Sequence, residues 1–260
     1  MDDNYQTYLN RVARMMLPDT YKSQVQHIHT SSKFQPQPSG GRKAVSFPGY
    51  TVITPPASED TENSAFYSRL NDYAAQLQLE TASGVIVPIP NGSFHLTLAD
   101  LIWDGAYRYA NEKNPQFGEQ LGVCITQIFQ QYQKSITSPQ GIRWQMLGLT
   151  VMPRAVAICL LPKDQESYEQ LLQFRRAIYQ NPDLMALGIE QQYNLTAHIT
   201  LGYFGDVTDI DRDRLSQTFW ELNQQWLEDS PEFLVQRAEL RKFDDMTRYD
   251  REPDWPVLNF

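Results

Sequence analysis

The sequence predicts an α+β fold in which two similar lobes, each an antiparallel sheet flanked by helices, are related by a pseudo-two-fold duplication around a central cleft. Three observations predict it. The tetrad histidine–apolar–threonine–apolar occurs twice, at His95–Leu98 and His198–Leu201. A strand pattern and then a helix pattern precede each tetrad, and the tetrads follow Thr51 and Ala155 by 44 and 43 residues. The short connection Met152–Arg154 between two strand patterns favours antiparallel pairing.

The first half of the duplicated region contains four expected elements besides its tetrad. A β-branched run predicts a strand at Tyr50–Pro55, and apolar residues at helical spacing predict a helix at Asn63–Leu79. After the tetrad, the same two kinds of pattern predict a helix at Glu112–Lys134 and a strand at Arg143–Met152.

The second half repeats this order of elements. A strand is expected at Ala155–Leu161 and a helix at Gln165–Tyr179, followed by the second tetrad. A helix at Asp209–Leu227 and a strand at Phe233–Lys242 complete the repeat. The period is too long for a solenoid, so it indicates an internal duplication.

Each tetrad places its histidine and its threonine on one face of a strand, because side chains alternate between the two faces. The two apolar residues then point into a core. A single tetrad is explained by a hydrogen-bonded polar pair in a strand. Two of the chain's four histidines fall in this pattern, which chance produces in under about one percent of such chains, so the matched pair indicates a shared function.

On these residues the chain resembles the two-histidine (2H) phosphoesterase superfamily of cyclic phosphodiesterases and RNA 2′-5′ ligase-like proteins, whose members carry this HxTx motif in each of two similar lobes. Phe47–Gly49 and Ser93–His95 resemble a branch classified as a domain of unknown function. The resemblance extends over the element order from about Phe47 to Phe243. It implies a hydrolase for 2′,3′-cyclic phosphates or related cyclic nucleotide and RNA-end phosphodiesters, acting without metal or cofactor and with both histidines catalytic.

The residue types fit this chemistry. Opening a cyclic phosphate needs a base that takes a proton from water and an acid that protonates the departing oxygen. His95 and His198 can hold both states near neutral pH, because the unperturbed pKa of histidine is about 6.5. Thr97 and Thr200 can donate their hydroxyls to non-bridging phosphate oxygens. The sequence does not distinguish the acid from the base.

Two other functions are compatible with the same motifs. A non-catalytic RNA- or nucleotide-binding module would keep the cleft, although it would not need two titrating groups. An RNA end-joining or end-trimming enzyme would use the same chemistry on longer substrates. In each case the expected partner is a small nucleotide or an RNA end, and the sequence identifies no protein partner.

Three aromatic residues follow the tetrads: Trp103, Tyr203 and Phe204. Trp103 is the candidate for stacking on a nucleobase at the mouth of the cleft. Strict alternation puts Tyr203 on the core face, opposite His198 and Thr200, where it is expected to pack.

Other polar residues are weaker candidates for a functional site. His27–His29 adjoins the polar stretch Ser31–Lys43 and is expected in a solvated loop. Asp100 and Asp104 follow the first tetrad and could complete a metal site with the histidines, but the second half offers only Asp206 for comparison. No metal site is therefore expected.

The duplicated region defines three segments: an N-terminal extension at 1–47, a bilobal two-histidine phosphoesterase-like domain at 48–245, and a C-terminal arm at 246–260. The extension contains a short helical pattern, Tyr8–Met16, and is expected to pack on the lobes or to form a lid. Two prolines predict that the arm is extended.

Composition limits the partners. The net charge of −9 argues against clamping of long nucleic acid, DNA included. Cys124 and Cys159 lie within apolar patterns and are expected to be buried thiols in a reducing compartment. The start of the sequence is acidic and no apolar run is long enough to cross a bilayer, so a cytoplasmic protein without a membrane partner is expected.

Overall fold

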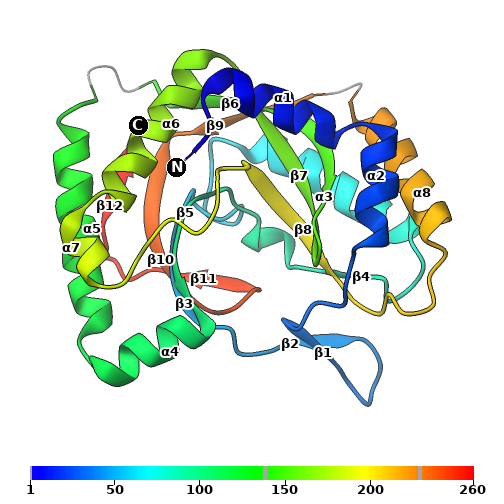
Figure 1. Cartoon of the computed structure of the whole chain (residues 1–260), viewed down its shortest axis with the longest axis horizontal. Helices are drawn as coiled ribbons and strands as arrows, with labels where there is room; N and C mark the ends of the chain where they lie inside the picture. The colour runs from blue at the N-terminus through cyan, green and yellow to red at the C-terminus, as the bar shows by residue number, and fades with distance from the viewer. Residues whose placement is uncertain (1, 137–139, 228–229) are drawn as a thin grey trace.

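The computed structural model describes residues 2–136, 140–227 and 230–260, which form helices and antiparallel sheets (Figure 1). The helices are α1 Tyr5–Met15, α2 Pro18–Gln26, α3 Ser64–Glu80, α4 Asp104–Lys113, α5 Phe117–Gln133, α6 Gln165–Tyr179, α7 Pro182–Ala186 and α8 Arg212–Trp226. The strands are β1 Phe34–Pro36, β2 Arg42–Ala44, β3 Gly49–Ile53, β4 Ile86–Pro88, β5 Thr97–Trp103, β6 Ile142–Val151, β7 Ala155–Pro162, β8 His198–Phe204, β9 Glu232–Val235, β10 Arg237–Asp245, β11 Arg248–Asp250 and β12 Val257–Asn259.

Two antiparallel sheets form the centre of the molecule, which confirms the predicted α+β fold. The first sheet has the order β11-β10-β3-β5, with β12 also paired to β10, and the second has the order β4-β8-β7-β6-β9. Helices α4, α5 and α7 lie on the outer side of the first sheet, α6 contacts strands of both sheets, and α2, α3 and α8 lie beside the second (Figure 1). The first motif leads into β5 and the second forms the start of β8, so each sheet carries one motif.

The two halves of the chain exchange strands. β6 follows the first motif in sequence but pairs with β7 in the second sheet, whereas β10 follows the second motif but pairs with β3 in the first. The single strand expected at Phe233–Lys242 is wrong for this reason: β9 ends at Val235 on one sheet and β10 begins at Arg237 on the other. Only Gln236 separates them, and a change of sheet within one residue leaves no break in the hydrophobic alternation.

The helix expected at Glu112–Lys134 is confirmed as α5 except for its start, because Glu112 and Lys113 belong to α4. The structure has α4 and α5, separated by residues 114–116. Pro115 lies in this gap, and it disfavours the helical conformation of the residue before it. Asn114 accordingly has the extended angles φ −139° and ψ 95°, which end α4.

The helices expected at Asn63–Leu79 and Gln165–Tyr179 are confirmed as α3 and α6. Asp164 begins α6 by accepting a hydrogen bond from the amide of Ser167, and the predicted apolar face of the helix is buried. That buried face also includes Arg175. Arg175 is therefore a cation buried among apolar side chains.

The N-terminal extension packs on the second sheet. The Tyr8 hydroxyl donates to the carbonyl of Leu160 in β7 (2.9 Å), and the Tyr21 hydroxyl donates to the carbonyl of Leu149 in β6. The stretch expected as a polar loop, Ser31–Lys43, contains the β1–β2 hairpin. We call residues 27–48 the connector, because they lead from α2 beside the second sheet to β3 in the first (Figure 1).

The C-terminal arm is extended, as expected, and part of it is a strand. β12 pairs with β10, and Leu258 and Phe260 are buried. Cys124 and Cys159 are free, buried thiols. Within the described residues, no helix has the length and apolar character needed to cross a membrane.

Candidate active site

A cavity of about 720 Å³ lies between the two sheets and contains every candidate site residue. Both histidines and both threonines line it, together with Trp103. The apolar residues of the tetrads, Leu96, Leu98, Ile199 and Leu201, are buried. The alternation predicted from the sequence therefore holds in both motifs, and the fold brings the motifs together.

The two histidines have matching hydrogen bonds. His95 Nδ1 lies 2.7 Å from the carbonyl oxygen of Ser93, and His198 Nδ1 lies 2.6 Å from the carbonyl oxygen of Thr196. A carbonyl only accepts, so each Nδ1 carries a proton and donates it. Only Nε2 of each ring then gains or loses a proton. Nε2 is a base when the ring is neutral and a hydrogen-bond donor when the ring is charged. Neither Nε2 has a hydrogen-bond partner among the described residues.

The pKa of His95 is lowered to about 4, chiefly because burial penalises the charged ring. The positive charges of His198 and Arg241 lower the pKa further, and the hydrogen bond to the Ser93 carbonyl opposes the shift. His95 is therefore neutral at pH 7. The effect of His198 also shows that the two rings are close enough to interact.

Burial also lowers the pKa of His198, but its neighbours differ from those of His95. The hydrogen bond to the Thr196 carbonyl and the negative charge of Asp100 raise the pKa, whereas the charge of Lys33 lowers it. The Tyr193 hydroxyl donates a hydrogen bond to the Asp100 carboxylate (2.5 Å). A carboxylate fixed in this way favours the protonated form of His198 over that of His95.

Irregularities in β5 bring three side chains to the cavity at three-residue spacing. On the neighbouring strand β3, every second residue from Gly49 to Ile53 points to the same face. The partners of these three β3 residues on β5 are Trp103, Asp100 and Thr97, and the pairing register shifts once between each partner and the next. Each shift adds one residue to β5, so positions 97, 100 and 103 share a face. The bulges thereby bring Asp100 to the cavity face, whereas Trp103, an even number of residues after Thr97, keeps the face that regular alternation predicts.

A bulge in β8 brings Tyr203 to the cavity face, so the expected face, opposite His198 and Thr200, is wrong, although Tyr203 is buried and packs in the core as expected. Thr200 lies opposite Ala157 and Tyr203 opposite Ala155, with a register shift between them. Tyr203 therefore lines the cavity with His198 and Thr200, and Phe204 takes the buried position. Gly202 within the strand was the available signal, since glycine inside a strand often marks a bulge.

Aromatic side chains form one rim of the cavity. The rings of Trp103 and Tyr193 lie 6.3 Å apart at 41°, and Tyr193 is exposed. On another side, Tyr249 of β11 places its ring 4.2 Å from that of His95. Arg241 holds this strand in place by donating to the carbonyl of Tyr249 (3.0 Å). Sequence analysis did not identify Tyr193 or Tyr249, because both lie outside the repeated elements.

The connector contributes to the cavity, which the sequence did not predict. His29, Lys33 and Phe47 line it, and Arg154 faces it from the turn between β6 and β7. Backbone hydrogen bonds tie the connector to both sheets: its Ser31 amide donates to Phe204 O (2.8 Å), and its Phe47 amide donates to the carbonyl oxygen of Asp244 (2.8 Å). The connector is thus a wall of the candidate site.

The residues considered for a metal site do not form a cluster, although His95, His198, Asp100 and Asp104 all line the cavity. Asp104 lines the cavity but pairs with Arg108 (3.4 Å), and Asp206 is exposed away from it. His27 and His29 are exposed, as expected, although His29 lies at the cavity rim. Among the residues that the structure describes, no three histidine, cysteine or acidic side chains form a cluster suited to a metal ion.

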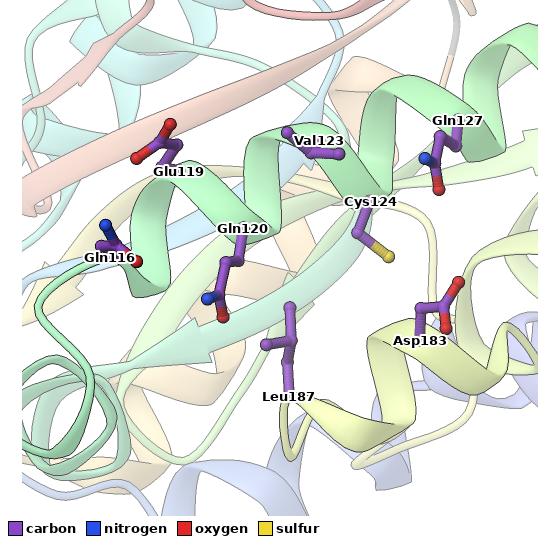
Figure 2. A pocket seen from close by; sticks show the side chains of 8 residues that line it. All are labelled: Gln116, Glu119, Gln120, Val123, Cys124, Gln127, Asp183 and Leu187. Carbon is purple, nitrogen blue, oxygen red and sulfur yellow. The ribbon is translucent and has the colours of Figure 1, made fainter.

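A second cavity, of about 390 Å³, lies between α5 and α7 away from both motifs (Figure 2). Its wall consists mainly of glutamine, acidic and aliphatic side chains, and Cys124 is its single sulfur group. The Cys124 thiol lies 3.6 Å from the side-chain oxygen of Asn181, and burial raises its pKa. A protonated, buried thiol is a poor nucleophile, so this cavity offers no comparable chemistry.

Comparison with known proteins gives a likeness of fold. No protein-family model matches the chain, and no curated protein matches its sequence. A conserved protein of unknown function from Agrobacterium tumefaciens is similar with a TM-score of 0.59 and 15% identity, over 86% of this chain and 90% of that one, so the two share a fold. A phosphoesterase gives a TM-score of 0.45 at 15% identity, over 82% of this chain and 98% of its own. E. coli LigT complexed with 3′-AMP gives 0.43 at 14% identity, over 82% and 98%.

Proposed function

We propose that this protein is a two-histidine phosphoesterase that opens 2′,3′-cyclic phosphates of nucleotides or RNA ends by acid–base catalysis, without a metal ion. One observation carries the proposal. His95 and His198 line the same cavity, each with Nδ1 held by a backbone carbonyl two residues earlier. This arrangement offers two Nε2 atoms to one phosphate, and the repeated motif resembles the superfamily in which both histidines act.

The electrostatics support different roles for the two histidines. His95 is neutral at pH 7 because its pKa is lowered to about 4, so it is the base that takes a proton from the attacking water. His198 has the Asp100 carboxylate to stabilise its charged form, so it is the acid. Water attacks phosphorus, the bond from phosphorus to one ribose oxygen breaks, and the proton of His198 passes to that oxygen.

Thr97 and Thr200 support the same step. Each lies two residues after a histidine on the cavity face of its strand. Their hydroxyls can donate to the non-bridging oxygens, on which negative charge grows as water adds. Two donors on opposite sheets would hold the phosphate between the two rings.

The test measures hydrolysis of 2′,3′-cyclic phosphates, both mononucleotides and oligonucleotides with defined ends, in the presence of EDTA. His95→Gln and His198→Gln should each lower kcat by at least about 10²-fold, since general acid–base groups contribute about 10² to 10⁴. Thr97→Val and Thr200→Val should lower it by up to about 10². His27→Gln is the matched control, because His27 is exposed and does not line the cavity.

Three results would contradict the proposal in different ways. Loss of turnover with EDTA would indicate metal chemistry, and turnover that survives both histidine substitutions would remove the mechanism. Tight binding of a nucleotide without turnover would favour a binding module. The oligonucleotide substrates separate hydrolysis from RNA end joining or trimming, which use the same acid–base groups.

A further inference from the structure

The connector brings a cation into the cavity. The Lys33 ammonium lies 4.5 Å from the ring centre of Phe47 and 5.0 Å from that of Tyr203. These rings hold the charge in a half-buried position, where burial lowers the pKa of Lys33 to about 8. Within residues 2–136, 140–227 and 230–260, no carboxylate forms an ion pair with Lys33.

A second cation lies beside the first. Arg154 lines the same cavity, and its positive charge repels that of Lys33, which lowers the pKa of Lys33. Arg154 is exposed, and its guanidinium has no ion pair with any residue that the structure describes. The charge of Asp100 raises the pKa of Lys33 and acts on it more strongly than that of Arg154, but the Asp100 carboxylate accepts a hydrogen bond from Tyr193 and forms no ion pair with Lys33. The two cations therefore line one cavity, and neither has an ion-pair partner in the part of the chain that the structure describes.

The position of these cations relative to the motif indicates what they would bind. Along β8, His198, Thr200 and Tyr203 face the cavity in that order, and Lys33 lies over the last of them. Tyr203 is paired two positions beyond Thr200, at Ala155 instead of Ala157. This offset is about 7 Å along the strand. Lys33 thus lies beyond the place where Thr200 would hold the reacting phosphate, and Arg154 lies near the same end of β8, where its carbonyl accepts from the amide of Phe204 (3.0 Å).

We propose that Lys33 and Arg154 form a second anion-binding subsite, which takes a phosphate on the 5′-oxygen of the nucleotide whose 2′,3′-cyclic phosphate is opened. This inference rests on the proposed function. A nucleoside 2′,3′-cyclic phosphate carries its next anion on the 5′-oxygen, either as a terminal monoester or as the diester to a preceding nucleotide. Both groups present phosphate oxygens to an ammonium and a guanidinium, which are the common phosphate ligands of proteins.

The first experiment compares kcat/KM for three substrates: adenosine 2′,3′-cyclic phosphate, the same compound with a 5′-phosphate, and a dinucleotide that ends in the cyclic phosphate. The protein should prefer the 5′-phosphorylated compound by about 10-fold or more, because charge-assisted hydrogen bonds are worth about that factor. In the double variant K33Q/R154Q the ratio should fall to near one. The dinucleotide shows whether the subsite prefers a monoester or a diester.

Lys43→Gln is the matched control. Lys43 lies in the same extension, is exposed and does not line the cavity, so its loss removes the same charge from the chain without touching the subsite. The preference for the 5′-phosphate should persist in this variant. Lys33→Gln removes a half-buried charge, which is not expected to unfold the protein, and a thermal melt of each variant verifies this.

A second experiment measures binding and needs no turnover. Adenosine 3′,5′-bisphosphate should bind about 10-fold or more tightly than adenosine 3′-monophosphate, and K33Q/R154Q should remove the difference. If this difference is found and no cyclic phosphate is hydrolysed, the subsite stands and the proposed function fails. If cyclic phosphates are hydrolysed and the difference is absent, the function stands and the subsite fails.

Two further results would overturn the subsite. A 5′-phosphate preference that is unchanged in K33Q/R154Q would place the recognition elsewhere. An equal loss of kcat/KM on substrates with and without the 5′-phosphate in Lys33→Gln would place the ammonium on the reacting phosphate instead.

Discussion

Asp100 makes an otherwise symmetric pair of histidines unequal. The residue three positions after the motif threonine is Asp100 in the first sheet and Tyr203 in the second, and both line the cavity. The carboxylate raises the pKa of His198, and it is not among the charges that act on His95. In the proposed mechanism, the residues that follow the motifs therefore decide which histidine is the acid and which is the base.

Asp100→Asn should move the alkaline limb of the kcat/KM profile to lower pH. Removal of the negative charge lowers the pKa of His198, and the acid must be protonated to act, so activity is lost at a lower pH than in the native protein. The profile between pH 4 and 10 measures this shift. Asp104→Asn is the control, since Asp104 lines the same cavity but pairs with Arg108 and should leave the limb in place. A limb that stays fixed in Asp100→Asn would contradict the assignment of His198 as the acid.

At this scale the sequence predicted which motif residues share the cavity but not their surroundings. His95, Thr97, His198 and Thr200 were identified because their spacing repeats. Lys33 was not, because only the packing of the connector brings it to the cavity, and no local pattern records that contact.

At the scale of the secondary-structure element, the bulges of β5 and β8 decide which side chains reach the cavity. An alternating strand would present positions 97, 99, 101 and 103, whereas β5 presents 97, 100 and 103. Secondary structure was largely predictable from periodicity, as α3, α6, β6 and β7 show. The bulges were not, because an inserted residue changes the pairing with a distant strand without changing the local composition.

Gly49 allows the close approach of β3 to β5 and β10. A Cβ at this position would lie 2.7 Å from Phe243 Cζ and 2.9 Å from Trp103 Cα, and it would also meet the carbonyl oxygen of Ile102. Gly49→Ala should therefore destabilise the protein by about 1–3 kcal/mol through overpacking, as measured by urea unfolding. Gly105→Ala is the control: a Cβ there meets nothing, and in α4 the change should stabilise by up to about 1 kcal/mol. Equal stability of the two variants would contradict this account.

At the scale of the whole molecule, the N-terminal extension ties the two sheets together. Asp2 pairs with Arg175 of α6 (2.7 Å), and Arg175 donates to the carbonyl of Leu98 in β5 (2.6 Å). Asp2 also accepts from the amide of Leu195, which lies just before β8. The extension thereby connects the strand of each motif to one buried ion pair. Helical periodicity placed Arg175 on the buried face of α6, but it could not reveal a partner 173 residues away.

Asp2→Asn should destabilise the protein by about 3 kcal/mol. The side chains of Asp2 and Arg175 are 4% and 5% exposed, and loss of one charge of a buried pair leaves the other uncompensated. Urea unfolding measures the change. Asp209→Asn provides a matched loss of one exposed carboxylate and should change stability by less than about 0.5 kcal/mol. If both substitutions have the same small effect, the buried pair does not stabilise the fold.

The exchange of strands between the halves has a consequence for protein synthesis. β10 lies between β3 and β11 in the first sheet, yet residues 237–245 are translated nearly two hundred residues after β3. A nascent chain that has reached the second motif holds both histidines but lacks an interior strand of the sheet that supports the first. Because domains generally fold as units during translation, the ribosome must release most of this chain before the site can form.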